Sequence, residues 1–186
     1  MRGQKGQTYK DWVGSDSWKE GQETERSFGE LIQARYPGAR PATLAEQYMH
    51  IDWVCSAGTV DVKAMKRKSR TGDKSEDFIW IEFKNNTGDK GWLYGQQDFL
   101  AFERTLDYIV VRRCHLKELA EKLCRFDNMV QDSCNALYKG YSRHNRDDLL
   151  SMIRMSDLLT IQHTKLNKIC RTSTNTTGAS QSSLKM

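Results

Sequence analysis

The chain has 186 residues, of which 38% are hydrophobic and 28% charged, and its mean hydropathy is -0.74. This composition excludes an intrinsically disordered chain and leaves room for one domain with a packed core. No run approaches the roughly 18 to 20 apolar residues that cross a bilayer, and the polar beginning lacks the apolar centre of a signal peptide. We therefore expect an intracellular, cytoplasmic protein without a membrane segment. The formal net charge of +5 suits a polyanionic partner.

Cysteine usage agrees with an intracellular protein. The five cysteines are odd in number and scattered, and no two form a CxxC pair. Such a pattern favours free thiols in a reducing compartment. The spacing of Cys114, Cys124 and Cys134 matches no common zinc site, so we expect these residues to be ordinary core or surface thiols.

The first elements in chain order are a loose arm and a helix. We expect residues 1–16 to form a flexible arm and residues 17–170 a single domain. Apolar residues recur at helical spacing over residues 18–36, Ser17 can cap the start of this helix, and Pro37 with Gly38 ends it.

Three strand-like runs follow the helix, over residues 47–55, 59–66 and 77–85. A polar, glycine-containing loop joins the second run to the third. The order predicts a β-meander behind the first helix.

The second half alternates strands and helices. Residues 96–104 fit a helix or a strand, 107–113 form a strand with an apolar centre, and 115–124 form a helix. A late strand and a short helix capped by Ser156 or Asp157 come next. Residues 171–186 are polar and of low complexity, which predicts a disordered tail.

Glu82 and Lys84 are the first candidates for chemistry. Residues two apart on a strand share a face, so both project from one side of IEFK while Ile81 and Phe83 project from the other. The apolar flanks predict a central strand, where an uncompensated acid costs several kcal/mol. A bound metal ion would compensate for that cost. The alternative is that Glu82 and Lys84 lie on a solvated strand face without a function.

Asp61, on the preceding predicted strand, can project beside Glu82 across an antiparallel pair. Two carboxylates at that distance repel each other, and a divalent cation such as Mg²⁺ or Mn²⁺ relieves the repulsion. Such an ion acidifies water and stabilises charge on a phosphate, while a nearby lysine shares that charge. These groups suit phosphodiester hydrolysis.

Three motifs in order resemble the PD-(D/E)xK nuclease superfamily, in particular its Holliday-junction resolvases and phage nucleases. GQETERSF resembles the helical motif, GTVDV the strand with the metal-binding Asp, and WIEFKN the strand with ExK. The resemblance covers residues 20–113. It implies Glu25 as the helix carboxylate, Asp61 and Glu82 as metal ligands, and Lys84 as the catalytic lysine.

The resemblance also implies a fold and an activity. The expected fold is α/β, with a restriction-endonuclease-like core of a mixed central β-sheet flanked by helices and a short C-terminal α/β extension. The expected activity is that of a Mg²⁺- or Mn²⁺-dependent endodeoxyribonuclease acting on DNA, with structure-selective cleavage, a homodimer and a phage or virus origin left open.

Two departures and a rival register accompany these motifs. Val60 stands where the family name has Pro, and a long insert separates Asp61 from Glu82. Asp52, Asp61 and Lys63 also spell an acid followed by DxK on adjacent strands. We prefer Glu82 and Lys84 because their strand is more apolar, and Asp61 belongs to both registers.

Basic and aromatic residues near the proposed site are candidates for nucleic-acid contact. A solvated turn and a packed core are the alternatives for them. The candidates are Lys66, Arg67, Lys68, Arg70, Lys74, Lys90, Trp92 and Tyr94, with a second patch at Tyr138, Tyr141, Arg143 and Arg146.

Two other classes of protein fit the same sequence. One is a non-catalytic nucleic-acid-binding protein that keeps the nuclease fold, which would bind DNA without regard to metal. The other is a structural protein whose acids are surface residues, which would not bind nucleic acid at all.

Overall fold

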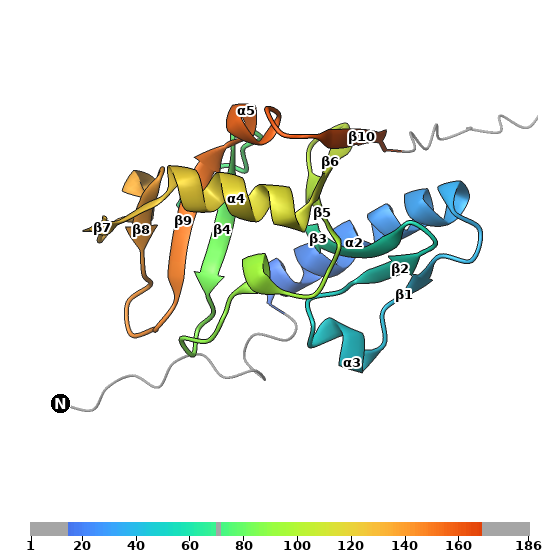
Figure 1. Cartoon of the computed structure of the whole chain (residues 1–186), viewed down its shortest axis with the longest axis horizontal. Helices are drawn as coiled ribbons and strands as arrows, with labels where there is room; N and C mark the ends of the chain where they lie inside the picture. Colours follow the sequence, from blue (N-terminus) through green and yellow to red (C-terminus); the bar gives the residue numbers. More distant parts are fainter. Residues whose placement is uncertain (1–14, 70–71, 169–186) are drawn as a thin grey trace, which may run out of the picture.

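The computed structural model describes residues 15–69 and 72–168 (Figure 1). This part of the chain is a mixed α/β fold with four helices and two mixed sheets, so the prediction of one central sheet is wrong. Residues 1–14 of the predicted arm, the whole predicted tail and Arg70 lie outside the described residues. None of the described helices has the length and apolar character needed to cross a membrane.

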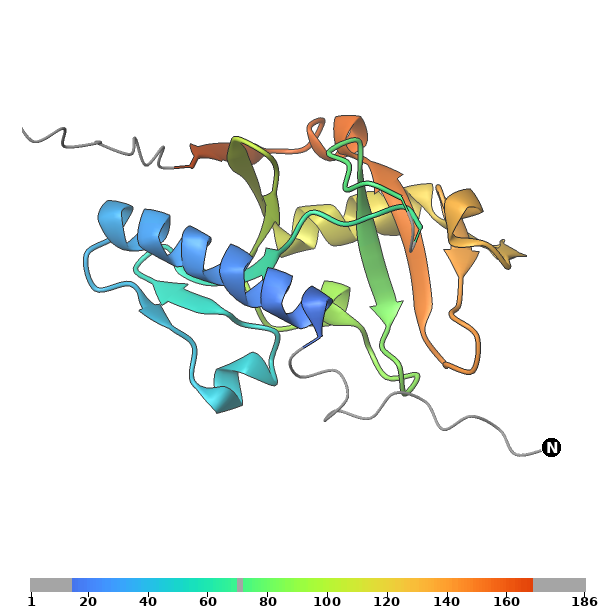
Figure 2. The same cartoon turned by 180° about the vertical axis from the view of Figure 1, so that it is seen from behind.

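The first helix, α2 (Asp16–Arg35), confirms the helical periodicity of the sequence. Ser15 rather than Ser17 is its cap, because the Ser15 hydroxyl accepts a hydrogen bond from Trp18 N at 3.3 Å. Its buried stripe includes Phe28, Leu31 and Ile32. The stripe packs on the first sheet, and Figure 2 shows α2 in front of β2 and β3.

The first sheet has six strands, with β3 and β5 parallel at its centre. Its strands in spatial order are β1 (Arg40–Pro41), β2 (Trp53–Cys55), β3 (Gly58–Lys63), β5 (Phe99–Glu103), β6 (Asp107–Arg112) and β10 (His163–Asn167). The parallel pair requires a long crossover, which contains the strand β4 and the short 3-10 helix η1 (Trp92–Tyr94).

The second sheet is built on that crossover strand. Its order is β4 (Phe78–Lys84), β9 (Leu149–Arg154), β8 (Lys139–Tyr141) and β7 (Arg125–Val130). β4 pairs with β9 and not with β3, so the predicted β-meander is wrong, and β4 is an edge strand rather than a central one. The late strand predicted from the sequence is β9.

Two short helices and one longer one complete the described fold. The longer helix α4 (Arg113–Leu123) confirms the predicted helix and crosses β4 and β9 on the side opposite α2 (Figure 1). α3 (Leu44–Gln47) ends at the residue where the strand 47–55 was expected to begin, and that strand is formed only over Trp53–Cys55. α5 (Met155–Leu158) contains Ser156 and Asp157, which were expected to cap it. Residues 96–104, which fitted a helix or a strand, contain the strand β5. The strands β7 and β10 were not predicted.

One hydrophobic core joins the two sheets. It contains Ile81 and Phe83 of β4, Leu100 of β5, Ile109 of β6 and Leu116 of α4. The alternation along β4 therefore buries its apolar face as expected, but against β5, β6 and α4. This packing brings the end of β3 close to the side of β4 that carries Glu82.

Candidate active site

Lys63, the last residue of β3, lies at the centre of the charged groups between the two sheets. Its Nζ is 2.7 Å from Asp61 Oδ1 and 4.9 Å from the centroid of the Trp92 ring. Burial lowers the pKa of Lys63, but the carboxylates of Asp61 and Asp52 outweigh it and the net shift is upward. Lys63 is therefore a held, charged ammonium group in a protected position.

Asp61 lies two residues earlier on the same face of β3, with only 2% of its surface exposed. Burial raises its pKa well above the ordinary value, the charge of Lys63 opposes this rise, and the carboxylate of Asp52 adds to it. A fully buried carboxylate beside a second one is costly, and Lys63 offsets only part of the cost.

Asp52 reaches the site through the β2–β3 hairpin. Trp53 pairs with Val60, so the next position along each strand places Asp52 opposite Asp61. Its Oδ2 accepts a hydrogen bond from Val62 N at 2.7 Å, which fixes the carboxylate against the β3 backbone. The fold therefore brings Asp52, Asp61 and Lys63, the three residues of the rival register, close together.

Glu25 comes from α2 and is half-buried. Burial, followed by the negative charge of Asp52, raises its pKa to about 7, although Lys63 acts in the opposite direction. The backbone of Glu25 is held as well, because Trp53 Nε1 donates a hydrogen bond to its carbonyl oxygen at 3.1 Å. α2 therefore places the carboxylate that the helical motif predicted near Asp52 and Lys63.

Trp92 and Gln97 surround this group and were not recognised as a pair from the sequence. Gln97, with 1% of its surface exposed, donates from Nε2 to Trp92 O at 2.8 Å, and that Nε2 lies 3.5 Å from Asp61 Oδ2. Within the described residues, Gln97 Oε1 accepts no hydrogen bond. No pattern around GQQDF indicated a buried amide, because its burial depends on η1 and β3 together.

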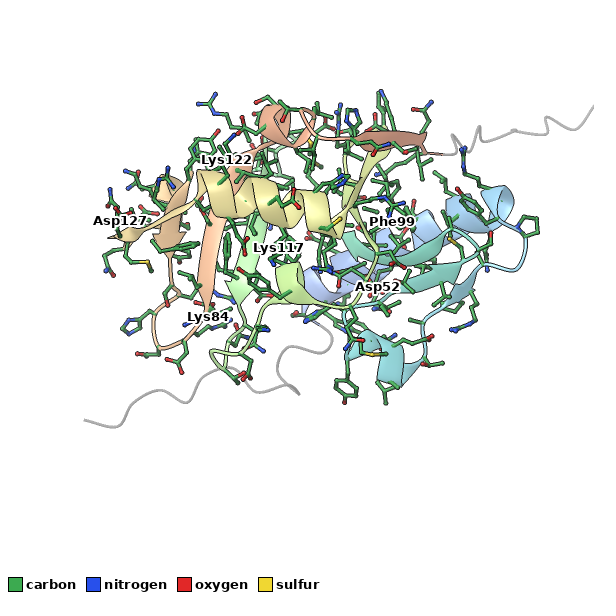
Figure 3. The ribbon with its side chains drawn as sticks, in the orientation of Figure 1. Asp52, Lys84, Phe99, Lys117, Lys122 and Asp127 are labelled. Atoms are coloured by element: carbon green, nitrogen blue, oxygen red, sulfur yellow. The ribbon has the colours of Figure 1, made fainter. Side chains whose placement is uncertain are left out.

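The preferred pair of the sequence, Glu82 and Lys84, lies on β4. Glu82 is half-buried, and burial raises its pKa while Lys63 lowers it. Lys84 is exposed beyond a register shift in the β4–β9 pairing. Figure 3 shows Lys84 at the end of β4, well away from Asp52 beside β2 and β3. The fold thus brings Glu82 toward Lys63 but does not bring Lys84 to Asp61.

The predicted nucleic-acid contacts fall into two sets. The set that lines one cleft of about 490 Å³ comprises Lys66, Arg67, Lys68, Lys74 and Trp92, together with Arg143 and Tyr141 of the second patch. Lys90 is exposed on the loop after β4, and Tyr94 is half-buried and donates from its hydroxyl to Glu121 at 3.1 Å. Trp92 has 8% of its surface exposed, so most of its ring is core rather than an open platform.

The donor set near Asp61 fits a hard divalent cation held by few protein oxygens. Among the described residues, no group of three or more His, Cys, Asp or Glu side chains is placed to hold a metal ion. Mg²⁺, however, usually takes one or two carboxylates and completes its shell with water and substrate oxygens. Asp52 and Asp61 are two such carboxylates, and their mutual repulsion is what a cation would relieve.

Comparison with known proteins adds no relationship. The chain matches no family model, and neither a curated protein nor a solved structure is similar enough to it to indicate kinship.

Proposed function

We propose that this protein is a metal-dependent nuclease that hydrolyses DNA phosphodiester bonds, and that its centre is Asp52, Asp61 and Lys63 with Glu25 beside them. The observation that carries the proposal is the convergence of carboxylates from a helix and a hairpin on one half-buried lysine, Lys63. Buried acids with raised pKa values around one fixed cation are costly to a fold, and such groups concentrate at functional sites.

Each residue has a role that follows from its surroundings. Asp52 and Asp61 would hold Mg²⁺ or Mn²⁺, which supplies a Lewis acid that acidifies water and neutralises charge on the phosphate. Lys63 places a positive charge where negative charge develops on the phosphate oxygens. The Trp92 ring lies 4.9 Å from the Lys63 ammonium and stabilises its charge through a cation–π contact.

Glu25 can hold or accept a proton near neutral pH, since its pKa is about 7. The same property couples metal binding to proton release, because a cation favours the ionised carboxylates. We therefore expect activity to rise with pH through the neutral range.

The proposal also includes a fold type and a choice between the two acid-x-lysine registers. A restriction-endonuclease-like core is supported by α2, the β2–β3 hairpin and the parallel strand β5. The second sheet is added to it in two pieces, with β4 between β3 and β5 and with β7, β8 and β9 between β6 and β10. The register that we now favour is Asp52, Asp61 and Lys63, because Lys63 contacts Asp61 and Lys84 lies apart.

The test is incubation with plasmid, linear, single-stranded and four-way-junction DNA in the presence of Mg²⁺, Mn²⁺ or EDTA. We expect cleavage that requires a metal and that Asp61→Asn abolishes. Absence of cleavage of every substrate by the unaltered protein would overturn the proposal. DNA binding that is indifferent to metal, without any cleavage, would instead favour a non-catalytic nucleic-acid-binding protein.

A further inference from the structure

A cleft opens beside the candidate active site on the side of the molecule opposite α4. Figure 2 shows the connection between β3 and β4 passing in front of β4 and β9 on that side. The cleft of about 490 Å³ lies between this connection and the second sheet. A smaller cavity of about 80 Å³ that reaches Lys63 shares Lys66, Trp80 and Trp92 with it. The cleft therefore lies next to the cavity that reaches the proposed centre.

The charge of the cleft is mainly positive. Its basic side chains are Lys66, Arg67, Lys68, Lys74 and Arg143. Glu20 neutralises part of this positive charge, because its Oε1 lies 3.4 Å from Lys74 Nζ and 4.0 Å from an Arg67 nitrogen. Lys66 has no carboxylate oxygen within 4.0 Å of its Nζ in the described part of the chain. Partial desolvation, followed by the charge of Lys63, lowers the pKa of Lys66.

Arg143 is held in place before any ligand arrives. Its Nε donates to the buried carboxylate of Asp148, and an Nη donates to Asn86 Oδ1 at 2.6 Å. The guanidinium has further N–H donors that these two partners do not use. A fixed guanidinium with donors to spare is well suited to a phosphate.

Two aromatic rings form the wall on the second sheet. Trp80 of β4 and Tyr141 of β8 are half-buried, with ring centroids 5.9 Å apart and ring planes at 47°. Trp80 Nε1 donates to Arg67 O at 3.1 Å, which ties the basic connection to this wall. Rings beside a row of basic side chains are the combination that binds unpaired bases together with their phosphates.

We infer that the cleft binds a single, unpaired strand of nucleic acid, with a base against Trp80 and Tyr141 and the backbone along the basic side chains. The inference rests on the proposed function, to which it adds the substrate class. Bases within a duplex cover one another's faces, so only an unpaired base can offer its face to a ring. The volume of the cleft is also that of a small-ligand site rather than of a double helix.

The test measures binding without catalysis. The unaltered protein is titrated in EDTA against fluorescent single strands and duplexes of about 12 nucleotides, a length within the range that one binding fold covers. We expect the single strand to bind at least about tenfold more tightly, and Tyr141→Leu to weaken its binding about 5- to 100-fold. Tyr141→Phe keeps the ring and the affinity. Tyr48→Leu makes the same change directly after α3, where Tyr48 is 81% exposed, and should have no effect.

A second variant keeps the test decisive if Tyr141→Leu fails to fold. Lys66→Gln should reduce the slope of log affinity against log salt by about 0.7, the value of one phosphate contact to a single strand. Lys122→Gln on α4 (Figure 3) should leave the slope unchanged.

The possible outcomes separate the two proposals. Equal binding of duplex and single strand, or full affinity in the folded Tyr141→Leu and Lys66→Gln variants, would overturn the inference. Selective single-strand binding without any metal-dependent cleavage would leave the inference standing and overturn the proposed function.

Discussion

Two acid-x-lysine pairs occur in this protein, and the fold treats them differently. Asp61 and Lys63 end a strand at the centre of the larger sheet, where they contact each other and face Asp52 and Glu25. Glu82 and Lys84 lie on an edge strand of the smaller sheet, and Lys84 extends into solvent. Identical spacing therefore does not give identical chemistry. What distinguishes the two pairs is the set of carboxylates that other elements bring to them.

The largest expected effect is on cleavage by lysine variants. Lys63→Ala should lower the rate about 10²- to 10³-fold, as removal of a preorganised charge at a reacting group does, whereas Lys84→Ala should leave it within about threefold of the unaltered protein. Rates on the preferred DNA substrate would measure this. The reverse result would restore the pair on β4.

A folding control accompanies these variants, because Lys63→Ala leaves the buried Asp61 without its partner. The double variant Asp61→Asn with Lys63→Met removes both charges and should remain folded, since replacing a buried ion pair by neutral groups is often close to neutral for stability. Circular dichroism would check the fold. We expect this folded protein to be inactive.

The next effect is the pH dependence of stability through Glu25. An acid with a raised pKa binds its proton more tightly in the folded chain than in the unfolded one. The free energy of unfolding therefore falls as pH rises from 4.5 to about 7. In EDTA, Glu25→Gln should raise it by at most about 3 kcal/mol at pH 8, with the gain vanishing below the ordinary pKa of Glu. Urea unfolding at several pH values would measure this.

Glu118→Gln is the matched control for Glu25, since Glu118 is an exposed carboxylate on α4. We expect a change within about 0.5 kcal/mol at every pH. If both substitutions gave the same pH profile, burial and the charge of Asp52 would not raise the pKa of Glu25 in the folded protein.

Metal binding provides a third comparison of the two pairs. Mg²⁺ at about 100 times its dissociation constant should stabilise the protein by about 2.7 kcal/mol. The rise in melting temperature should disappear in Asp52→Asn and persist in Lys84→Ala. Persistence of the full shift in Asp52→Asn would remove Asp52 from the metal site.

The smallest effects concern the packing that holds Glu25 in place. A Cβ at Gly29 would lie 1.9 Å from Trp53 Cζ2, the ring whose nitrogen binds the Glu25 carbonyl. Gly29→Ala should therefore destabilise the protein by about 1–3 kcal/mol. Gly21→Ala on the same helix meets nothing closer than 4.0 Å and should stabilise by about 0.5–1 kcal/mol. Thermal unfolding of both variants would compare them, and destabilisation by both would contradict the close contact at Trp53.

Local elements could largely be predicted from the sequence. The apolar spacing of α2, the alternation along β4 and the apolar centre of β6 are properties of neighbouring residues, and the structure confirms them. β3 is a strand as predicted, but it is buried on both faces at Val60, Asp61 and Val62. β7 is exposed along most of its length, so it lacks the burial pattern by which a strand is predicted. β10 is likewise exposed except at Leu166.

The sequence alone was enough to select Asp61 as a candidate, because it belongs to both registers, and to predict the helix that carries Glu25. Only the tertiary structure decided that β3 pairs with β2 and β5 while β4 leaves for a second sheet. Strand pairing depends on where apolar faces far apart in the chain can be buried together, here on a core shared by β4, β5, β6 and α4. Lys63 lies beside Asp61 because the two are two residues apart on β3. The shared core takes β4 into the second sheet and so keeps Lys84 away from Asp61, which local spacing could not reveal.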